Sequence, residues 1–141
     1  MTDNASKTSF VVAGKDVDNS YRHMHHAEIL KPLEKARKEL FESRGISLQK
    51  LMEEGTFPVV SKIEIEYLRE IREGRYNIVS EVVEISRKEL CIEQKIYNDK
   101  NKIATKAKVF LRFLRAGYPL SAPVPEAVSN SFGVADTKRG G

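Results

Sequence analysis

Three side chains that can exchange protons stand close together near the start of the sequence: Asp18, His23 and His25. A carboxylate or an imidazole can take a proton from water or attack a carbonyl carbon, so these residue types suit general-base or nucleophilic catalysis. The structural alternatives are that Asp18 only caps a turn or pairs with Arg22, and that His23 is a packed or solvated histidine. Residue types alone leave the catalytic and the structural interpretation of this loop open.

A long amphipathic helix is predicted directly after this loop. From Ala27 to Arg44 the apolar residues recur at three- and four-residue spacing, and Gly45 is well placed to end the helix. Pro32 has no amide hydrogen, so the helix either begins only a turn before it or bends there. The first amides of a helix are unpaired and lie at the positive end of its dipole, so residues 22–26 could direct them at a substrate carbonyl. In enzymes that stabilise a developing oxyanion, such a donor is worth roughly 3 to 4 kcal/mol.

The rest of the fold is predicted to be an antiparallel sheet. Phe57 to Tyr67 alternates apolar and polar residues, the pattern of a half-buried strand, with the apolar set Phe57, Val59, Ile63 and Ile65 on one face. The other predicted strands are a short one at 10–12 and three later ones at 76–85, 90–97 and 103–114, joined by short polar connections. This order predicts an α+β fold in which a five-stranded antiparallel sheet is wrapped around one long helix.

A single folded domain is predicted for residues 10–115, because 141 residues suit one domain with one core. Residues 1–9 are polar and are predicted to form a flexible N-terminus. Residues 116–141 contain many Gly, Pro, Ser and Ala residues, a composition that cannot supply much core. We expect this C-terminal tail to be ordered only if it lies on a partner subunit.

The composition favours a globular protein, since 40% of the residues are hydrophobic and 31% are charged. The single cysteine, Cys91, cannot form an internal disulfide, and no apolar run is long enough for a signal peptide or a membrane span. We therefore expect a cytoplasmic protein with no membrane partner. The net charge is +4, but basic and acidic residues are interleaved, so nucleic acid is not an expected partner.

Four segments of the sequence resemble the motifs of one enzyme family. They are Asp16-Val17-Asp18, His23-Met24-His25-His26-Ala27, Leu33-Glu34-Lys35-Ala36-Arg37 and the stretch from Ile65 to Gly74. In this order they resemble the Asp-x-Asp, the His-Val-Asn-Asn type loop, the Leu-Glu-x-Ala-Arg helix and the Glu-Tyr-x-Arg-Pro-x-Arg-x-Gly-Asp stretch of hotdog-fold acyl-CoA and acyl-carrier-protein thioesterases. The 4-hydroxybenzoyl-CoA thioesterase-like enzymes belong to this group. The resemblance covers roughly Phe10 to Leu114.

The resemblance implies a hotdog fold and the hydrolysis of a small-molecule or carrier-bound acyl thioester to a free acid and a thiol. Asp18 would be the general base for water or the nucleophile, and His23 would orient the carboxylate or the substrate. His25 and Glu34 are further candidates for the catalytic site, although a helical Glu flanked by lysines is often a solvated ion-pair member. No cofactor is implied, because coenzyme A enters only as part of the substrate.

Arg69, Arg72 and Arg75 surround the strand connection at Gly74, where the family often meets the phosphates of coenzyme A. Arginine suits phosphate because its planar guanidinium donates paired hydrogen bonds. The alternative is a solvated basic turn balanced by acidic neighbours. This chain departs from the family pattern around the same site, with residues that stand where a glycine, asparagines, a proline and an aspartate are expected: Arg22, His25, His26, Glu70 and Arg75.

Other functions are compatible with the same residues. Asp18 and His23 have the spacing of the Asp-x-Asn-Pro-x-His motif of hotdog enoyl-CoA hydratases, although Ser20 and Tyr21 replace its Asn and Pro. A non-catalytic acyl-CoA-binding regulator would bind the ligand without turnover. A metal is not expected, because neighbouring histidines point in different directions. An open sheet edge, together with the resemblance, implies a homo-dimer or a tetramer.

Overall fold

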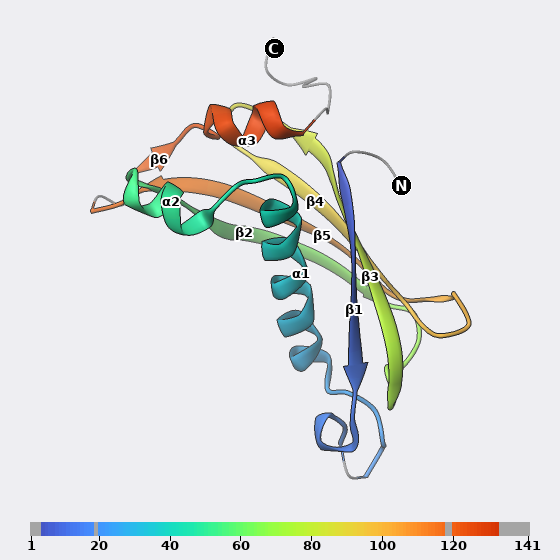
Figure 1. The fold of residues 1–141 in the computed structure, drawn as a ribbon. Helices are drawn as coiled ribbons and strands as arrows, with labels where there is room; N and C mark the ends of the chain where they lie inside the picture. The colour runs from blue at the N-terminus through green and yellow to red at the C-terminus, as the bar shows by residue number, and fades with distance from the viewer. Residues whose placement is uncertain (1–3, 19, 118–119, 133–141) are drawn as a thin grey trace.

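The structure is a computed structural model, and it describes residues 4–18, 20–117 and 120–132. One long helix lies against the concave side of a curved antiparallel sheet (Figure 1). The strands are β1 (Ala5–Val12), β2 (Thr56–Tyr67), β3 (Gly74–Ile85), β4 (Leu90–Tyr97), β5 (Ile103–Arg115) and the short β6 (Ser121–Ala122). Their spatial order is β1-β3-β4-β5-β2, with β6 added to β5. This arrangement confirms the predicted α+β fold.

The helices are α1 (Leu30–Ser43), α2 (Leu48–Glu53) and α3 (Glu126–Ser131), with short 3-10 helices at Gly14–Asp16 and His26–Ile29. The 3-10 helix at His26–Ile29 leads directly into α1, so Pro32 lies in the first turn of α1, where its missing amide costs no hydrogen bond. No helix in the described part of the chain is long and apolar enough to span a membrane.

Gly45 ends α1 as the sequence predicts. Its φ is +74°, and its amide donates to the Glu42 carbonyl at 3.0 Å, while the amide of Ile46 donates to the Phe41 carbonyl at 3.0 Å. This pair of bonds is the Schellman motif, which needs a left-handed residue after the last helical turn. The buried side of α1 carries Leu33, Ala36, Leu40 and Phe41, and these side chains pack on the sheet in the main core cluster.

A β-bulge interrupts β2 between Val60 and Lys62, where Ser61 is the extra residue. A bulge shifts the alternation of a strand by one residue. The side chains on the helix side are therefore even-numbered before the bulge and odd-numbered after it: Pro58, Val60, Ile63 and Ile65. The prediction that Phe57 and Val59 share a face with the later isoleucines is wrong for this reason.

Both ends of the chain are more ordered than the composition predicts. β1 begins at Ala5, not at residue 10, because residues 5–9 pair with β3 from Glu81 to Asn77. The predicted tail contains β6 and α3, and four of its apolar side chains are buried in the same core as α1: Ala122, Val124, Val128 and Phe132. The tail prediction is wrong for these residues, which pack on their own chain. Residues 1–3, 118–119 and 133–141 lie outside the described residues.

Candidate functional site

The loop that precedes α1 is folded back on itself by backbone hydrogen bonds. The amide of Asp18 donates to the His23 carbonyl at 2.9 Å, and the amide of Arg22 donates to the Asp18 carbonyl at 2.8 Å. Arg22 has a φ of +59°, a conformation that glycine adopts without strain. The amide of Met24 then donates to the Ile71 carbonyl at 2.6 Å, so the loop is fixed to the segment between β2 and β3.

The Asp18 carboxylate caps the turn that follows it. Its Oδ1 accepts hydrogen bonds from the amides of Ser20 at 2.7 Å and Tyr21 at 3.0 Å. The Tyr21 and Ser20 amides lower the pKa of Asp18 below its usual value of 3.8, and the charges of His23 and His25 lower it further. The turn-capping alternative therefore describes a real contact of Asp18. It leaves the second carboxylate oxygen for chemistry, within electrostatic range of His23 and His25.

Three histidines line one cavity of about 380 Å³ between the loop and the end of β2. The Nδ1 atom of His23 lies 3.9 Å from Oε1 of Glu70. The rings of His25 and His26 stack with centroids 4.4 Å apart, and the ring of His26 meets that of Tyr67 edge to face at 6.0 Å. The cavity therefore combines imidazoles, a carboxylate and a phenol. Its other lining residues are Met24, Ile29, Leu68, Arg69 and Ile71.

Asp18 lines a second cavity of about 320 Å³ on the other side of the same loop segment. Met24 and His25 line both cavities, so they form the wall between Asp18 and His23. The structure thus brings Asp18 into one cavity with His25 and places His23 in the neighbouring one. A substrate carbonyl held by both would have to lie across the loop segment at Met24 and His25.

The amides at the entry of the helix are partly occupied. The amide of Ala27 donates to Nδ1 of His25 at 3.3 Å, and the amide of Glu28 donates to the His25 carbonyl at 2.9 Å. The expectation that the first amides are unpaired is therefore wrong for these two residues. The reason is that His25 acts as the N-cap and satisfies them itself. The amide of His26 is not engaged by either bond, and it is the candidate oxyanion donor at this helix end.

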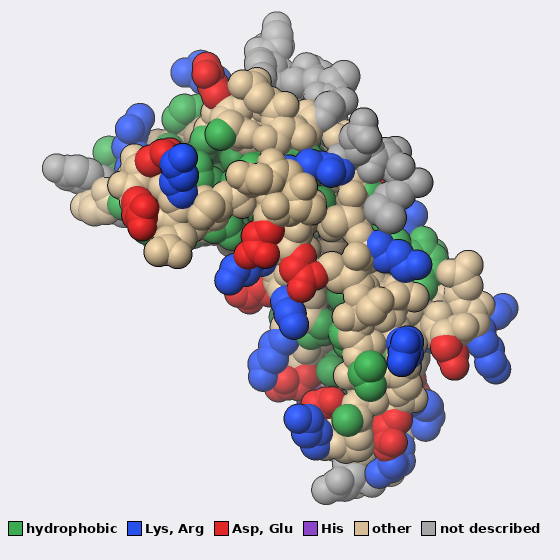
Figure 2. Space-filling view, viewed as in Figure 1, with side chains coloured by type: hydrophobic (Ala, Val, Ile, Leu, Met, Phe, Trp, Pro, Cys, Tyr) green, Lys and Arg blue, Asp and Glu red, His purple; other side chains and the backbone are tan. Residues whose placement is uncertain are grey.

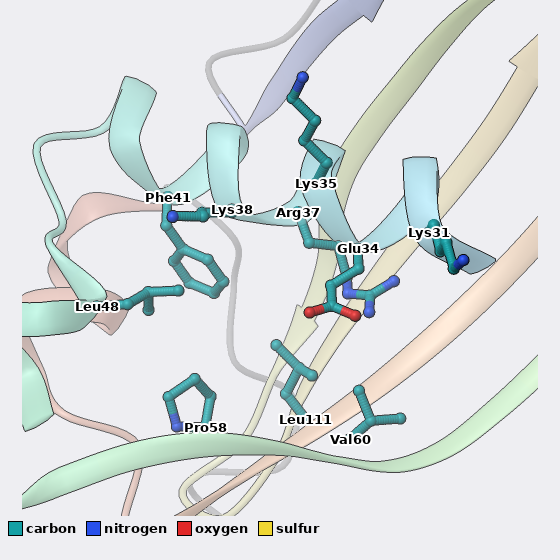
Figure 3. A pocket seen from close by; sticks show the side chains of 10 residues that line it. All are labelled: Lys31, Glu34, Lys35, Arg37, Lys38, Phe41, Leu48, Pro58, Val60 and Leu111. Carbon is teal, nitrogen blue, oxygen red and sulfur yellow. The ribbon is translucent and has the colours of Figure 1, made fainter. Parts of the chain in front are cut away.

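Glu34 lies in a different cavity from Asp18 and the histidines. This cavity has a volume of about 590 Å³ and lies between α1, α2 and the sheet. The Glu34 carboxylate points from α1 toward Val60 and Leu111 and lies beside the Arg37 guanidinium (Figure 3). The space-filling view shows acidic and basic side chains interspersed along this side of the molecule (Figure 2). Glu34 therefore faces a mixed-charge wall and an apolar floor, and it shares no cavity with the candidate catalytic loop.

The three arginines do not converge on one point. Arg69 lines the cavity of the histidines, and its Nη1 donates to the Ile103 carbonyl at 2.6 Å. Arg72 donates from Nη2 to Oε2 of Glu70 at 2.6 Å, while Arg75 is exposed on β3. Arg69 therefore borders the site directly, and Arg72 is connected to it through Glu70. Among the described residues no three His, Cys, Asp or Glu side chains are placed to hold a metal ion.

A family model for the thioesterase-like superfamily matches residues 12–132. The chain belongs to the thioesterase-like superfamily. The match begins at the end of β1 and ends at the last described residue, so it includes the loop, the helix, the sheet and the C-terminal segment that packs on the core. A comparison with curated proteins found no match.

Solved structures with the same fold include several thioesterases. The 1,4-dihydroxy-2-naphthoyl-CoA thioesterase from Synechocystis has a TM-score of 0.81 and 14% identity, and the match covers 90% of this chain and 94% of that one. A DHNA-CoA thioesterase from Staphylococcus aureus has a TM-score of 0.79 and 19% identity, with 89% of each chain covered. A further Staphylococcus aureus protein, solved in complex with CoA, has a TM-score of 0.83 and 17% identity over 93% of this chain and 83% of that one. These likenesses establish the hotdog fold.

Three polar lining residues of this thioesterase-like protein were missed from the sequence as site residues: His26, Tyr67 and Glu70. Tyr67 stands at the end of β2 and its hydroxyl donates to the His26 carbonyl at 3.4 Å. Glu70 occupies the position where the family signature has proline, which was the only sequence signal for it. Among the apolar residues near the site, Ile29 lines the histidine cavity, Leu33 is a fully packed core residue, and Val59 lies on the other face of β2.

Proposed function

We propose that this chain hydrolyses acyl thioesters of coenzyme A or of a carrier protein at the loop that leads into α1. The observation that carries the proposal is the Asp18 carboxylate, kept ionised by two backbone amides and placed next to imidazoles at the entry of the helix. An ionised carboxylate at this position can take a proton from water or attack the thioester carbonyl directly. Membership of the thioesterase-like superfamily supports thioester hydrolysis over the hydratase and the non-catalytic alternatives.

Different residues around the loop can supply the negative charge, the donor to the carbonyl oxygen and the contact to a phosphate. Asp18 supplies the negative charge, and the helix entry at His26 supplies a candidate donor for the carbonyl oxygen as it becomes negative. Arg69 borders the same cavity, where a guanidinium suits a phosphate of the carrier. We assign no cofactor to the reaction, because coenzyme A or the carrier leaves as the thiol product.

The 590 Å³ cavity is separate from the two loop cavities but reaches Lys31 in the first turn of α1, and it offers room for an acyl group that extends from the loop along the helix. Its floor is apolar and is formed by Phe41, Leu48, Pro58, Val60 and Leu111. Apolar walls of this kind favour a hydrocarbon or aromatic acyl group over a short polar one. Val60 is exposed at the open side of this cavity, so Val60→Trp fills it from β2 without disturbing the core. We expect Val60→Trp to lower turnover of long acyl thioesters and to leave acetyl thioesters unaffected.

The decisive test is a thiol-release assay with acyl-CoA substrates of varied length and aromaticity. We expect the wild-type protein to release thiol, and Asp18→Asn and Asp18→Ala to lower the rate by at least about 100-fold. Asp99→Asn, which removes an exposed carboxylate in the β4–β5 turn, is the matched control and should retain the wild-type rate. Turnover close to wild type in Asp18→Asn would transfer the catalytic role to a histidine or to Glu34.

The same assay separates the alternatives. An enoyl-CoA offered to the protein should lose its thioester without hydration of the double bond. Hydration without thiol release would instead assign the hydratase reaction. Binding of acyl-CoA with no turnover, unaffected by Asp18→Ala, would assign the non-catalytic regulator.

We also propose that the protein acts as a homo-dimer or a tetramer. β2 pairs only with β5 within the described residues, so one side of a long strand has backbone groups without a neighbouring strand. Pro58 and the bulge at Ser61 interrupt the first half of β2, which leaves the regular stretch from Lys62 to Tyr67 as the part able to pair with a second copy. Light scattering at micromolar concentration should give a multiple of 16.0 kDa, and a monomeric mass would contradict the proposal.

A further inference from the structure

His23 has a buried ring nitrogen that lacks a hydrogen-bond partner. The ring as a whole is 31% exposed and borders the histidine cavity, but Nδ1 is shielded from solvent. A shielded polar atom without a partner is unfavourable, because water can no longer bind it. The neighbourhood of Nδ1 should therefore contain the group that completes this contact in the working enzyme.

Glu70 is the charged group that faces this nitrogen. Its Oε1 lies 3.9 Å from Nδ1, about 1 Å longer than an ordinary hydrogen bond. Catalytic hydrogen bonds are often long in ligand-free structures and shorten when substrate binds.

The other oxygen of Glu70 is already held in place. Oε2 accepts a hydrogen bond of 2.6 Å from the guanidinium of Arg72. The backbone of Arg72 is itself fixed, because its amide donates to the Tyr76 hydroxyl at 2.9 Å. Tyr76 is buried in β3, so this chain of contacts leads from the sheet to the carboxylate. Arg72 thus fixes Glu70 by one oxygen and leaves the other for His23.

We propose that Glu70 is a positioning residue for His23, and that His23 activates the water that frees the acyl group after Asp18, acting as the nucleophile of the thioesterase reaction proposed above, has taken it from the thiol. Glu70 accepts a hydrogen bond from Nδ1–H, and this contact leaves the lone pair of the imidazole on Nε2. The second nitrogen of a histidine sets the tautomer of the first in this way. Glu70 stands where the family signature has proline, so the signature itself does not supply this contact.

The reaction then balances with the groups at hand. The Asp18 carboxylate attacks the thioester carbonyl carbon, the carbon–sulfur bond breaks, and the thiolate leaves and takes a proton from solvent, so that the acyl group is held on Asp18 as an anhydride. Nε2 of His23 then takes a proton from water as the water oxygen bonds to the acyl carbon. The bond from this carbon to the Asp18 oxygen breaks as the carbonyl reforms, and the imidazolium returns its proton to solvent. The products are a carboxylic acid and a thiol, and His23 returns to its starting tautomer with Asp18 and Glu70 unchanged.

The test combines kinetics with the nuclear magnetic resonance of His23. We expect Glu70→Ala to lower kcat roughly 10- to 100-fold and to change KM less than about threefold, the scale of losing a residue that orients a catalytic group. Glu70→Gln keeps an acceptor oxygen and should recover a part of the rate. Glu53→Gln removes an exposed carboxylate on α2 that lines neither loop cavity, and it is the matched control.

The ring nitrogen-15 shifts of His23 give a readout that a merely structural role would not move. The wild-type protein should carry the proton on Nδ1, and Glu70→Ala should shift the population toward the Nε2–H tautomer. An unchanged tautomer, or unchanged kcat in Glu70→Ala, would overturn the role of Glu70 while the thioesterase proposal stands. Absence of thiol release from the wild-type protein would contradict the thioesterase proposal itself.

Discussion

Arg37 reaches from α1 into the core and donates a hydrogen bond of 3.0 Å from Nη1 to Oε1 of Gln94. Gln94 is fully buried in the middle of β4, and its Nε2 donates to the Leu33 carbonyl and to the Ser80 hydroxyl, each at 2.9 Å. Burial lowers the pKa of Arg37, and the charge of Glu34 opposes that effect. These contacts fix the position of α1 on the sheet, and therefore the position of the loop that α1 continues.

We expect Gln94→Leu to lower the free energy of unfolding by about 2 to 4 kcal/mol. The substitution leaves the buried guanidinium of Arg37 and the Ser80 hydroxyl without their partner, and an unsatisfied buried polar group costs more than the bond itself contributed. Urea unfolding followed by circular dichroism measures the effect. The double variant Arg37→Met with Gln94→Leu should recover part of the loss, because both polar partners are then absent. Gln49→Leu, at an exposed position of α2, should change stability by less than about 0.5 kcal/mol.

The pH dependence of turnover should show no acidic limb from Asp18 above about pH 4. The amides of Tyr21 and Ser20 hold the pKa of Asp18 below 3.8, so the carboxylate stays ionised until the pH falls below that value. The stability that this carboxylate gives the folded loop is likewise fully present above the pKa of Asp18 in the unfolded chain. It is lost only as the pH falls through the lowered pKa of the folded state. A kcat/KM profile between about pH 3 and pH 9 checks this. A limb centred above pH 5 would assign the limiting ionisation to another group.

Cys91 should be inert in the folded protein. The thiol is buried on β4, and burial raises its pKa to about 11, with nearby Lys108 opposing the shift. At pH 8 roughly one thiol in a thousand is then the reactive thiolate, against about a quarter for an ordinary cysteine. We expect a disulfide reagent to modify the folded protein at least about 100-fold more slowly than the urea-unfolded protein. Lys88→Cys in a Cys91→Ser background provides an exposed thiol for comparison, and equal rates for the two would contradict the prediction.

The parts of the fold that follow from local rules could be predicted from the sequence. Gly45 is the one residue type that ends a helix in a left-handed conformation at no steric cost, and α1 does end there. The order of the family motifs gave the fold and placed Asp18, His23 and His25 in one loop. These features depend on residues close together in the chain, and the structure agrees with them.

The parts that depend on distant contacts could not be predicted in the same way. Ser61 is an ordinary strand residue in sequence, and only its pairing with β5 makes it a bulge that exchanges the faces of Val59 and Val60. Glu70 lies near His23 only because folding brings together two segments that are far apart in the chain. The segment after Arg115 has a composition typical of a tail, but a few apolar residues are enough to bury it once the sheet and α1 provide a surface.

The C-terminal segment should contribute to stability through Phe132. The ring of Phe132 is 2% exposed and meets the ring of Phe41 on α1 edge to face, with centroids 6.0 Å apart. Phe132→Ala removes a buried ring and leaves a cavity against α1, so we expect the free energy of unfolding to fall by about 3 to 4 kcal/mol. Leu120→Ala, at a side chain that is 58% exposed in the same segment, should change it by less than about 0.5 kcal/mol. If Phe132→Ala unfolds at the same urea concentration as the wild-type protein, the segment is not part of the core. A loss confined to Phe132→Ala would instead show that residues beyond the last long strand hold the helix that positions the catalytic loop.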